Sequence, residues 1–199
     1  MKLNLKGAEA TLTRIKNGLV KRRLAKTYRV KELDERIRKL RTRSEFKIIK
    51  HLSANGVNVP HVFSLNEENF EFELEHLNGV LLRIKLGDVN SKAAANLCEK
   101  AGVQIAKVHL AGVVHGDCTT SNLLASSNGE IYVIDFGLSE MTSSNEERAL
   151  DLQLFKKTVA LVLFEAFLKG YVSEMKSQAK PVIERLENIE QRGRYKKRN

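Results

Sequence analysis

The chain has 199 residues, of which 42% are hydrophobic and 29% are charged, with 34 Lys and Arg against 24 Asp and Glu. This composition is that of a globular protein and excludes a disordered chain, and no run approaches the ~18 apolar residues of a membrane-spanning helix. The start, MKLNLKGAEA, has no apolar signal segment, and Cys98 and Cys118 form neither a zinc motif nor a disulfide framework, so we expect a cytoplasmic protein.

The positive charge is concentrated at the two ends of the chain. Residues 1–50 contain 17 Lys and Arg against 5 Asp and Glu, and residues 192–199 contain five Lys and Arg and no acid. Such ends are either solvated helix faces with a disordered basic tail, or surfaces for phosphate-rich partners such as ATP or RNA.

The first 23 residues predict three short strands. The runs LNL and TLTRI come before Asn17-Gly18, and LVKRR follows it. Asn-Gly between two alternating runs is a strong hairpin signal. Because side chains alternate along a strand, Lys21 and Arg23 share one face of the third strand and Arg22 lies on the other.

A helix and a further strand follow. The helix is predicted over 33–54, because apolar residues recur on one face at Leu33, Ile37, Leu40, Ile48 and Leu52. Residues 70–76, FEFELEH, alternate as a half-buried strand does, and Asn78-Gly79 then breaks the chain.

The second half of the chain is mainly helical. Helices are predicted over 91–109, with Ser91 as N-cap, over 150–168 and over 173–191, and a buried strand over 131–134. Strands with one helix followed by helices indicate an α+β molecule. We expect a sheet lobe over 1–78, a helical lobe over 79–191 and a basic tail over 192–199.

Two motifs in the second half carry the chemistry. The string HGDCTTSN spans residues 115–122, and Asp135-Phe136-Gly137 follows the strand IYVI. A carboxylate, an amide five residues on and a second carboxylate after a strand form the arrangement of a kinase catalytic loop with its DFG motif. Asp117 would meet the attacking hydroxyl or water, and Asn122 and Asp135 would offer oxygens to Mg²⁺.

The first half contains candidates for the other groups of such a site. Lys21 is the candidate for the lysine that binds the ATP phosphates, with Arg22, Arg23 and Lys26 as alternatives. Glu45 borders the buried face of the predicted helix and could hold that lysine.

Two stretches of backbone are expected to contact the nucleotide. There is no GxGxxG, and Gly7, Ala8, Glu9 and Ala10 stand where a glycine-rich loop would lie, with N–H groups that could face phosphate. Glu75 and Leu77 are expected in the hinge between the lobes, against adenine. Asp151, expected at the start of the helix after DFG, could accept N–H bonds from the catalytic loop.

Together with GAEA, the Val20-Lys21 strand and Arg41-Thr42-Arg43-Ser44-Glu45, these motifs resemble the small atypical kinases of the KEOPS complex, the PRPK family, which is related to RIO kinases. The resemblance runs essentially end to end. It implies a minimal two-lobed protein-kinase-like fold with a Lys21–Glu45 ion pair, Asp117 as catalytic acid/base, and Asn122 and Asp135 as metal ligands.

The resemblance also implies a function. The family consists of serine/threonine kinases and ATPases that use ATP and Mg²⁺. They act with a threonylcarbamoyl transferase of the ASKHA class and other KEOPS subunits in modifying adenosine in tRNA. The basic tail is the expected contact for tRNA.

Several departures from ordinary protein kinases are visible. Gly116 replaces the Arg of HRD, Thr119 replaces the usual Lys, and Cys118 stands where the family is expected to have Leu. Only 13 residues separate Gly137 from Asp151 and there is no APE, which predicts that no activation-segment platform is present. The alternatives are a small-molecule phosphotransferase of the aminoglycoside or choline kinase type, or a non-catalytic RNA-binding scaffold.

Overall fold

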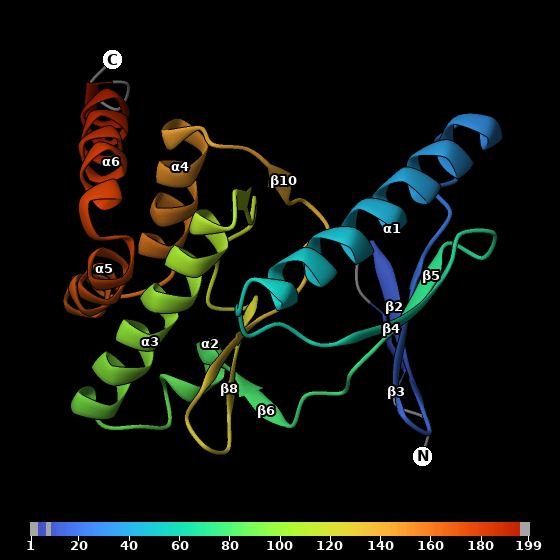
Figure 1. Cartoon of the computed structure of the whole chain (residues 1–199), viewed down its shortest axis with the longest axis horizontal. Coiled ribbons are helices and arrows are strands. Elements are labelled where there is room, and N and C mark those ends of the chain that lie inside the picture. The colour runs from blue at the N-terminus through green and yellow to red at the C-terminus, as the bar shows by residue number, and fades with distance from the viewer. Residues whose placement is uncertain (1–3, 7–8, 196–199) are drawn as a thin grey trace.

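The computed structural model describes the backbone of residues 4–6 and 9–195, which forms two lobes side by side (Figure 1). One lobe holds a five-stranded antiparallel sheet and the long helix α1 (Lys31–Ala54). The other holds the remaining helices and two small sheets. The two-lobed α+β arrangement expected from the sequence is confirmed.

The sheet of the first lobe has the strand order β1-β2-β3-β5-β4. Its strands are β1 (Asn4–Lys6), β2 (Ala10–Ile15), β3 (Gly18–Arg23), β4 (Val62–Asn66) and β5 (Glu71–Leu74). The predicted hairpin joins β2 to β3, with Ile15 opposite Gly18. The sequence analysis does not predict β4. Only Val62 of its five residues is fully buried, so the strand has no alternation of apolar and polar residues that the sequence could show.

Strand β3 has the predicted alternation. Lys21 and Arg23 are 8% and 5% exposed, whereas the side chain of Arg22 is 55% exposed and pairs with Glu71 at 2.6 Å. The two buried cations therefore share the face of the sheet that lies against α1.

Helix α1 is buried along its C-terminal half. Ile48, Ile49 and Leu52 pack against the sheet, and the ring of Phe46 meets the edge of Phe72. The expectation that the apolar face continues to the N-terminus is wrong, since Leu33 and Leu40 are 51% and 54% exposed. The first turns of the helix extend past the strands, so no sheet covers them (Figure 1).

The C-terminal end of α1 is tied to the helical lobe. Nε2 of His51 lies 2.8 Å from the carbonyl oxygen of Ala111. Beyond the helix, the N–H of Val133 donates to the carbonyl oxygen of Asn58 at 2.8 Å, and the N–H of Asn58 donates to Gln104 at 2.9 Å. These bonds fix α1 relative to the strand that precedes the DFG motif.

The second lobe surrounds the catalytic-loop segment. Its helices are α2 (Leu82–Lys85), α3 (Ser91–Leu110), α4 (Asn145–Lys156), α5 (Leu161–Met175), the 3₁₀ turn η1 (Lys176–Gln178) and α6 (Ala179–Tyr195). Its strands are β6 (Gly79–Leu81), β8 (Leu123–Ser126) and β9 (Ile131–Val133) in one sheet, and β7 (Val113–Val114) with β10 (Glu140–Met141) in another. In the described part of the chain no helix is long and apolar enough to cross a membrane.

Three predicted helix boundaries are wrong. Asn90, not Ser91, caps α3, because its side chain accepts the N–H of Ala93. The single helix predicted over 150–168 is two helices, since both the N–H and the hydroxyl of Thr158 bind the carbonyl oxygen of Phe155 and end α4. Helix α6 continues to Tyr195, so four residues of the predicted tail extend it, whereas 196–199 lie outside the described residues.

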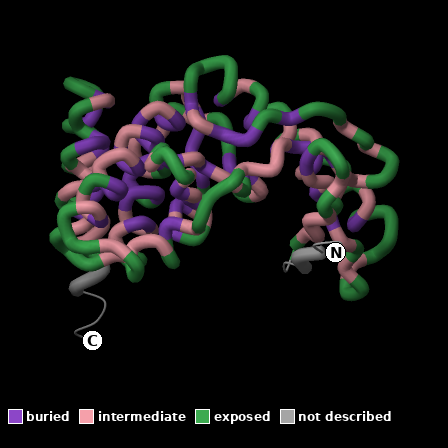
Figure 2. The backbone as a smooth tube through the Cα atoms, turned by 90° about the horizontal axis from the view of Figure 1, so that it is seen from below, coloured by how far each residue is buried: buried purple, intermediate pink, exposed green. Residues whose placement is uncertain are grey.

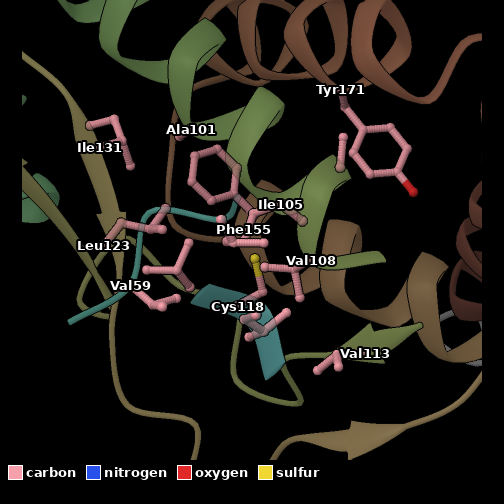
Figure 3. Packing of buried hydrophobic residues seen from close by; sticks show 14 of the residues in the cluster. Val59, Ala101, Ile105, Val108, Val113, Cys118, Leu123, Ile131, Phe155 and Tyr171 are labelled. Atoms are coloured by element: carbon pink, nitrogen blue, oxygen red, sulfur yellow. The ribbon is translucent and has the colours of Figure 1, made fainter. Parts of the chain in front are cut away.

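The core is densest between the helices of the second lobe. Many of the buried residues, coloured purple in Figure 2, lie in this lobe. Figure 3 shows Ile105, Phe155 and Tyr171 among the packed side chains. Helices α3 and α5 approach so closely that a Cβ atom at Gly102 or Gly170 would collide with the backbone of the facing helix. Glycine at these two positions sets the spacing of the helices that support the catalytic loop.

We therefore expect Gly102→Val to lower the free energy of unfolding by about 3 kcal/mol, because the added side chain forces α3 and α5 apart. Urea unfolding followed by circular dichroism measures the change. Gly87→Val is the matched control, since a Cβ there meets its nearest backbone atom at an ordinary 3.4 Å. Equal stability of the two variants would contradict the packing argument.

Candidate active site

The structure brings Lys21, Glu45 and Asp135 together from three separate segments. Nζ of Lys21 in β3 lies 2.6 Å from Oε1 of Glu45 in α1 and 2.8 Å from Oδ1 of Asp135 after β9. Glu45 is 1% exposed, whereas the side chain of Asp135 is 56% exposed. The lysine therefore joins a buried carboxylate of the sheet lobe to an open carboxylate of the helical lobe.

The charges in this group stabilise one another. Burial alone would lower the pKa of Lys21, but the charges of Glu45 and Asp135 raise it above its ordinary value, so the side chain is cationic. Desolvation acts to raise the pKa of Asp135, and the nearby Lys21 outweighs it and holds that pKa below the ordinary value. Asp135 is thus an ionised, accessible carboxylate.

Asp117 and Asn122 are hydrogen-bonded to each other in the catalytic loop. The amide nitrogen of Asn122 donates to the carbonyl oxygen and to Oδ2 of Asp117, both at 2.8 Å. This leaves Oδ1 of Asp117 and the amide oxygen of Asn122 outside the pair. The N–H of Ile134 binds the backbone oxygen of Asn122 at 2.9 Å, which connects the loop to the residue before Asp135.

His115 fixes the loop against the DFG motif. Nδ1 of His115 accepts the N–H of Asp117 at 3.2 Å, so Nε2 carries the proton and donates to the carbonyl oxygen of Ile134 at 3.1 Å. The imidazole also lies against the ring of Phe136, with centroids 5.1 Å apart. The positions of Asp117 and Asp135 are therefore linked through one side chain.

The backbone of the loop is held by Asp151. Its carboxylate accepts the N–H of His115 at 2.6 Å and that of Gly116 at 2.9 Å, which confirms the expected hydrogen bonds. The expectation that Asp151 begins a helix is wrong, because it lies in the middle of α4, whose N-cap is Ser144. Gly116 has φ 76°, and a Cβ there would collide with the carbonyl oxygen of Leu138.

A buried imidazole supports Asp151 from behind. Nε2 of His109 lies 3.1 Å from Asp151, and Nδ1 lies 2.8 Å from the hydroxyl of Tyr171. Nε2 donates to the carboxylate, so Nδ1 accepts the hydroxyl proton of Tyr171. Desolvation lowers the pKa of His109, more than Asp151 raises it, and the ring is neutral.

The loop expected to cover the phosphates is described in part. Gly7 and Ala8 lie outside the described residues. Glu9 is exposed and pairs with Arg41 of α1 at 3.2 Å and with Lys26 at 3.6 Å, while Ala10 begins β2 opposite Arg23. The acidic side chain is thus directed to cations of α1 and of the β3–α1 connection.

The expected hinge residues lie in the connection between β5 and β6. Glu75 is partly exposed and bound to His61 twice, since its N–H donates to the His61 carbonyl oxygen at 2.8 Å and its carboxylate accepts the His61 N–H at 3.1 Å. Leu77 is also partly exposed in this connection. The connection is therefore braced against the segment before β4.

Sequence reasoning missed three members of the site. The sequence analysis treats Arg23 only as an alternative to Lys21, whereas the structure shows both residues bound to Glu45. The alternation of β3, which puts Arg23 on the same face as Lys21, could have indicated this contact. His109 and Tyr171 sit inside apolar helix patterns that resemble ordinary core. Cys118, next to Asp117, points into the core (Figure 3), and burial raises the pKa of its thiol well above the ordinary value.

The residues present fit a magnesium–nucleotide complex. Mg²⁺ prefers a few carboxylate or amide oxygens and shares the rest of its shell with phosphate and water. The ionised carboxylate of Asp135 is accessible, and the amide nitrogen of Asn122 is already engaged, which leaves its oxygen as the ligand. No cluster of three or more His, Cys, Asp and Glu forms a separate metal site within residues 9–192.

The amino-acid sequence of the chain matches a known family of proteins. The family model of the RIO domain matches residues 3–179. The KEOPS complex subunit Bud32 of Pyrococcus abyssi is 36% identical over 189 residues, covering 91% of this chain and 86% of that protein. A probable bifunctional tRNA threonylcarbamoyladenosine biosynthesis protein of Methanocorpusculum labreanum is 38% identical and covers 96% of this chain. This chain spans 35% of that longer relative.

A solved structure supports the fold. The Rio2 kinase of Chaetomium thermophilum, in a complex with ADP, Mg²⁺ and phosphoaspartate, aligns with a TM-score of 0.64 at 15% sequence identity. The alignment covers 98% of this chain and 70% of that one. The fold is therefore that of a protein kinase, with a small sheet lobe and a helical lobe.

The neutral state of His109 predicts a pH dependence of stability. Because its pKa is lowered by folding, the unfolded chain takes up a proton first as the pH falls below about 6.5, and the free energy of unfolding decreases. His109→Gln, which cannot titrate, should flatten this part of the curve. Urea unfolding at several pH values measures it; parallel curves for the two proteins would exclude His109 as the cause.

Proposed function

The chain belongs to the RIO-domain family, and on this premise we propose that it is an atypical serine/threonine protein kinase with ATPase activity. It binds MgATP between its lobes and transfers the γ-phosphoryl group to serine or to water. It does so as a KEOPS component that supports threonylcarbamoyladenosine modification of tRNA, as the names of its relatives suggest.

One observation carries the proposal more than any other. A single cationic nitrogen, Nζ of Lys21, contacts a buried glutamate of α1 and an accessible aspartate of the opposite lobe. A scaffold that had lost nucleotide chemistry would have no need of this costly charged group between its lobes. The arrangement supports an enzyme over a non-catalytic RNA-binding scaffold.

Each residue has a defined task in the proposed reaction. Lys21 binds the α- and β-phosphates, and Asn122 and Asp135 hold Mg²⁺. When bound, the metal offsets the charge of the polyphosphate. Asp117 keeps Oδ1 outside its hydrogen bond with Asn122, and this oxygen accepts the proton of the attacking hydroxyl or water.

The segment after the DFG motif supports a restricted choice of acceptor. Only residues 138–144 lie between Gly137 and α4, and two of them form β10, which pairs with β7 beside the catalytic loop. This leaves little surface on which an extended substrate peptide could dock. Water, or a serine presented by a partner or by this chain, is the acceptor that fits.

The names of the relatives support the proposed partners. Bud32 is named as a KEOPS subunit, and the longer relatives are named as threonylcarbamoyladenosine biosynthesis proteins. The partners are a threonylcarbamoyl transferase of the ASKHA class, the other KEOPS subunits and tRNA.

Two substitutions separate the chemical step from metal binding. Asp117→Asn should lower ATP turnover roughly 10²–10⁴-fold with little change in nucleotide affinity, because it removes the proton acceptor alone. Asp135→Ala should nearly abolish turnover and also remove the Mg²⁺ dependence of nucleotide binding. Steady-state kinetics and MgATP titrations measure both; an unchanged Mg²⁺ dependence in Asp135→Ala would refute the assignment.

The basic end of the chain is expected to bind tRNA. Replacing Arg192, Arg194, Lys196, Lys197 and Arg198 by Gln keeps the length of the chain while removing charge. We expect weaker tRNA binding, a shallower dependence on salt and less tRNA-stimulated ATP turnover, with MgATP affinity unchanged. Titration with tRNA at several salt concentrations is the measurement, and superimposable curves would leave these residues as a solvated end.

A further inference from the structure

Arg23 occupies a place that the proposed reaction does not explain. It lies on β3 two residues after Lys21, is 5% exposed, and its Nη2 donates to Oε2 of Glu45 at 2.5 Å. Lys21 holds the other oxygen, Oε1, at 2.6 Å. One buried carboxylate is therefore shared by two cations, one on each oxygen.

Arg23 also reaches the DFG turn. A Cβ at Gly137 would lie 3.3 Å from Nη2 and 3.8 Å from Nη1 of Arg23, and 3.2 Å from Oδ1 of Asp135. The guanidinium thus lies beside the glycine of that motif. Through Arg23, strand β3 contacts both Glu45 of α1 and the turn that carries Asp135.

The burial of Arg23 is expensive for stability. Its Nε is buried and has no hydrogen-bond partner among the residues described. A buried donor without an acceptor costs free energy, and a position optimised for folding alone would favour an apolar side chain. A buried Arg23 beside Glu45 is therefore not the arrangement that folding alone would favour.

The charges around Lys21 indicate a role for Arg23. The carboxylate of Glu45 is almost fully buried and requires a cation at all times. Lys21 is divided between Glu45 and Asp135, and it must also reach the nucleotide phosphates. Among the ion pairs of the described residues, the guanidinium of Arg23 takes part only in the one with Glu45.

We propose that Arg23 is a positioning residue that permanently neutralises Glu45 and so frees Lys21 to bind the nucleotide phosphates. This inference rests on the proposed function and assigns to β3 a second cation that acts through Glu45. Without it, the buried carboxylate draws Lys21 away from the nucleotide. Nucleotide affinity then falls, while the groups at the phosphoryl acceptor are unaffected.

The test compares Arg23→Met with Arg22→Met in the full chain. Both remove one positive charge from neighbouring positions of β3, but Arg22 is exposed and faces away from Glu45. We expect Arg23→Met to raise KM for MgATP about tenfold with a smaller change in kcat, and Arg22→Met to change neither. Arg23→Lys, which keeps the charge, should restore KM to within about threefold of the wild-type value.

The split between KM and kcat separates this role from a structural one. A fold defect would lower kcat through a smaller active fraction and leave KM unchanged. Unchanged KM in Arg23→Met, or Arg23→Lys as impaired as Arg23→Met, would overturn the proposal. If Arg23→Met does not fold, the double variant Arg23→Met with Glu45→Gln should fold, because no buried charge is left unpaired; failure of the double variant to fold would also overturn it.

The same series separates this inference from the proposed function. Titration with MgADP measures nucleotide affinity without turnover. If the wild-type protein binds MgADP but hydrolyses no ATP, the proposed function fails and the affinities of the Arg23 variants still decide the role of Arg23. An Arg23→Met affinity equal to that of Arg22→Met would overturn the role in either case.

Discussion

The buried carboxylate of Glu45 is the constraint on which the arrangement of the two lobes depends. A carboxylate with 1% exposure is tolerated when cations meet it in the protein interior, and β3 provides two of them on one face. Helix α1 must therefore lie where Glu45 faces that strand. His51 and Asn58 tie the end of the helix to the other lobe, so the same geometry carries Lys21 to Asp135. The ion pairs and the interlobe hydrogen bonds together hold the two lobes in the relative position that the structure shows.

A second carboxylate, Asp151, has the corresponding role for the catalytic loop. Loop backbone is usually exposed because its N–H groups need partners, and here two of them, from His115 and Gly116, are satisfied by one side chain from α4. His109 and Tyr171 complete the hydrogen bonding of Asp151 in the core between α3 and α5. The position of the Asp117 backbone is therefore set by helices α3, α4 and α5, which hold the partly exposed Asp117 side chain in a fixed orientation.

Much of this site could be predicted from sequence because it rests on short-range rules. Strand alternation placed Lys21 and Arg23 together, and motif spacing selected Asp117, Asn122 and Asp135, whose catalytic roles remain predictions. What failed depends on tertiary context. In the sequence, the apolar positions of α1 continue to its N-terminal end at Leu33. In the structure the sheet does not extend that far along the helix, so Leu33 is exposed. The break after α4 has neither Gly nor Pro, and it arises from a side-chain cap by Thr158 that no periodicity reveals. Strand β4 is exposed over most of its length and shows no pattern.

The conformation of Gly116 limits the paths by which this protein could evolve. In signalling kinases an arginine at this position can report phosphorylation of a downstream segment. Here φ is 76°, and the carbonyl oxygen of Leu138 occupies the place of any side chain. A single amino-acid substitution at position 116 would thus strain the backbone next to Asp117. This cost would arise before the new side chain could take part in regulation. Acquisition of that switch would also require a longer segment after the DFG motif, so point mutation alone gives no route to it.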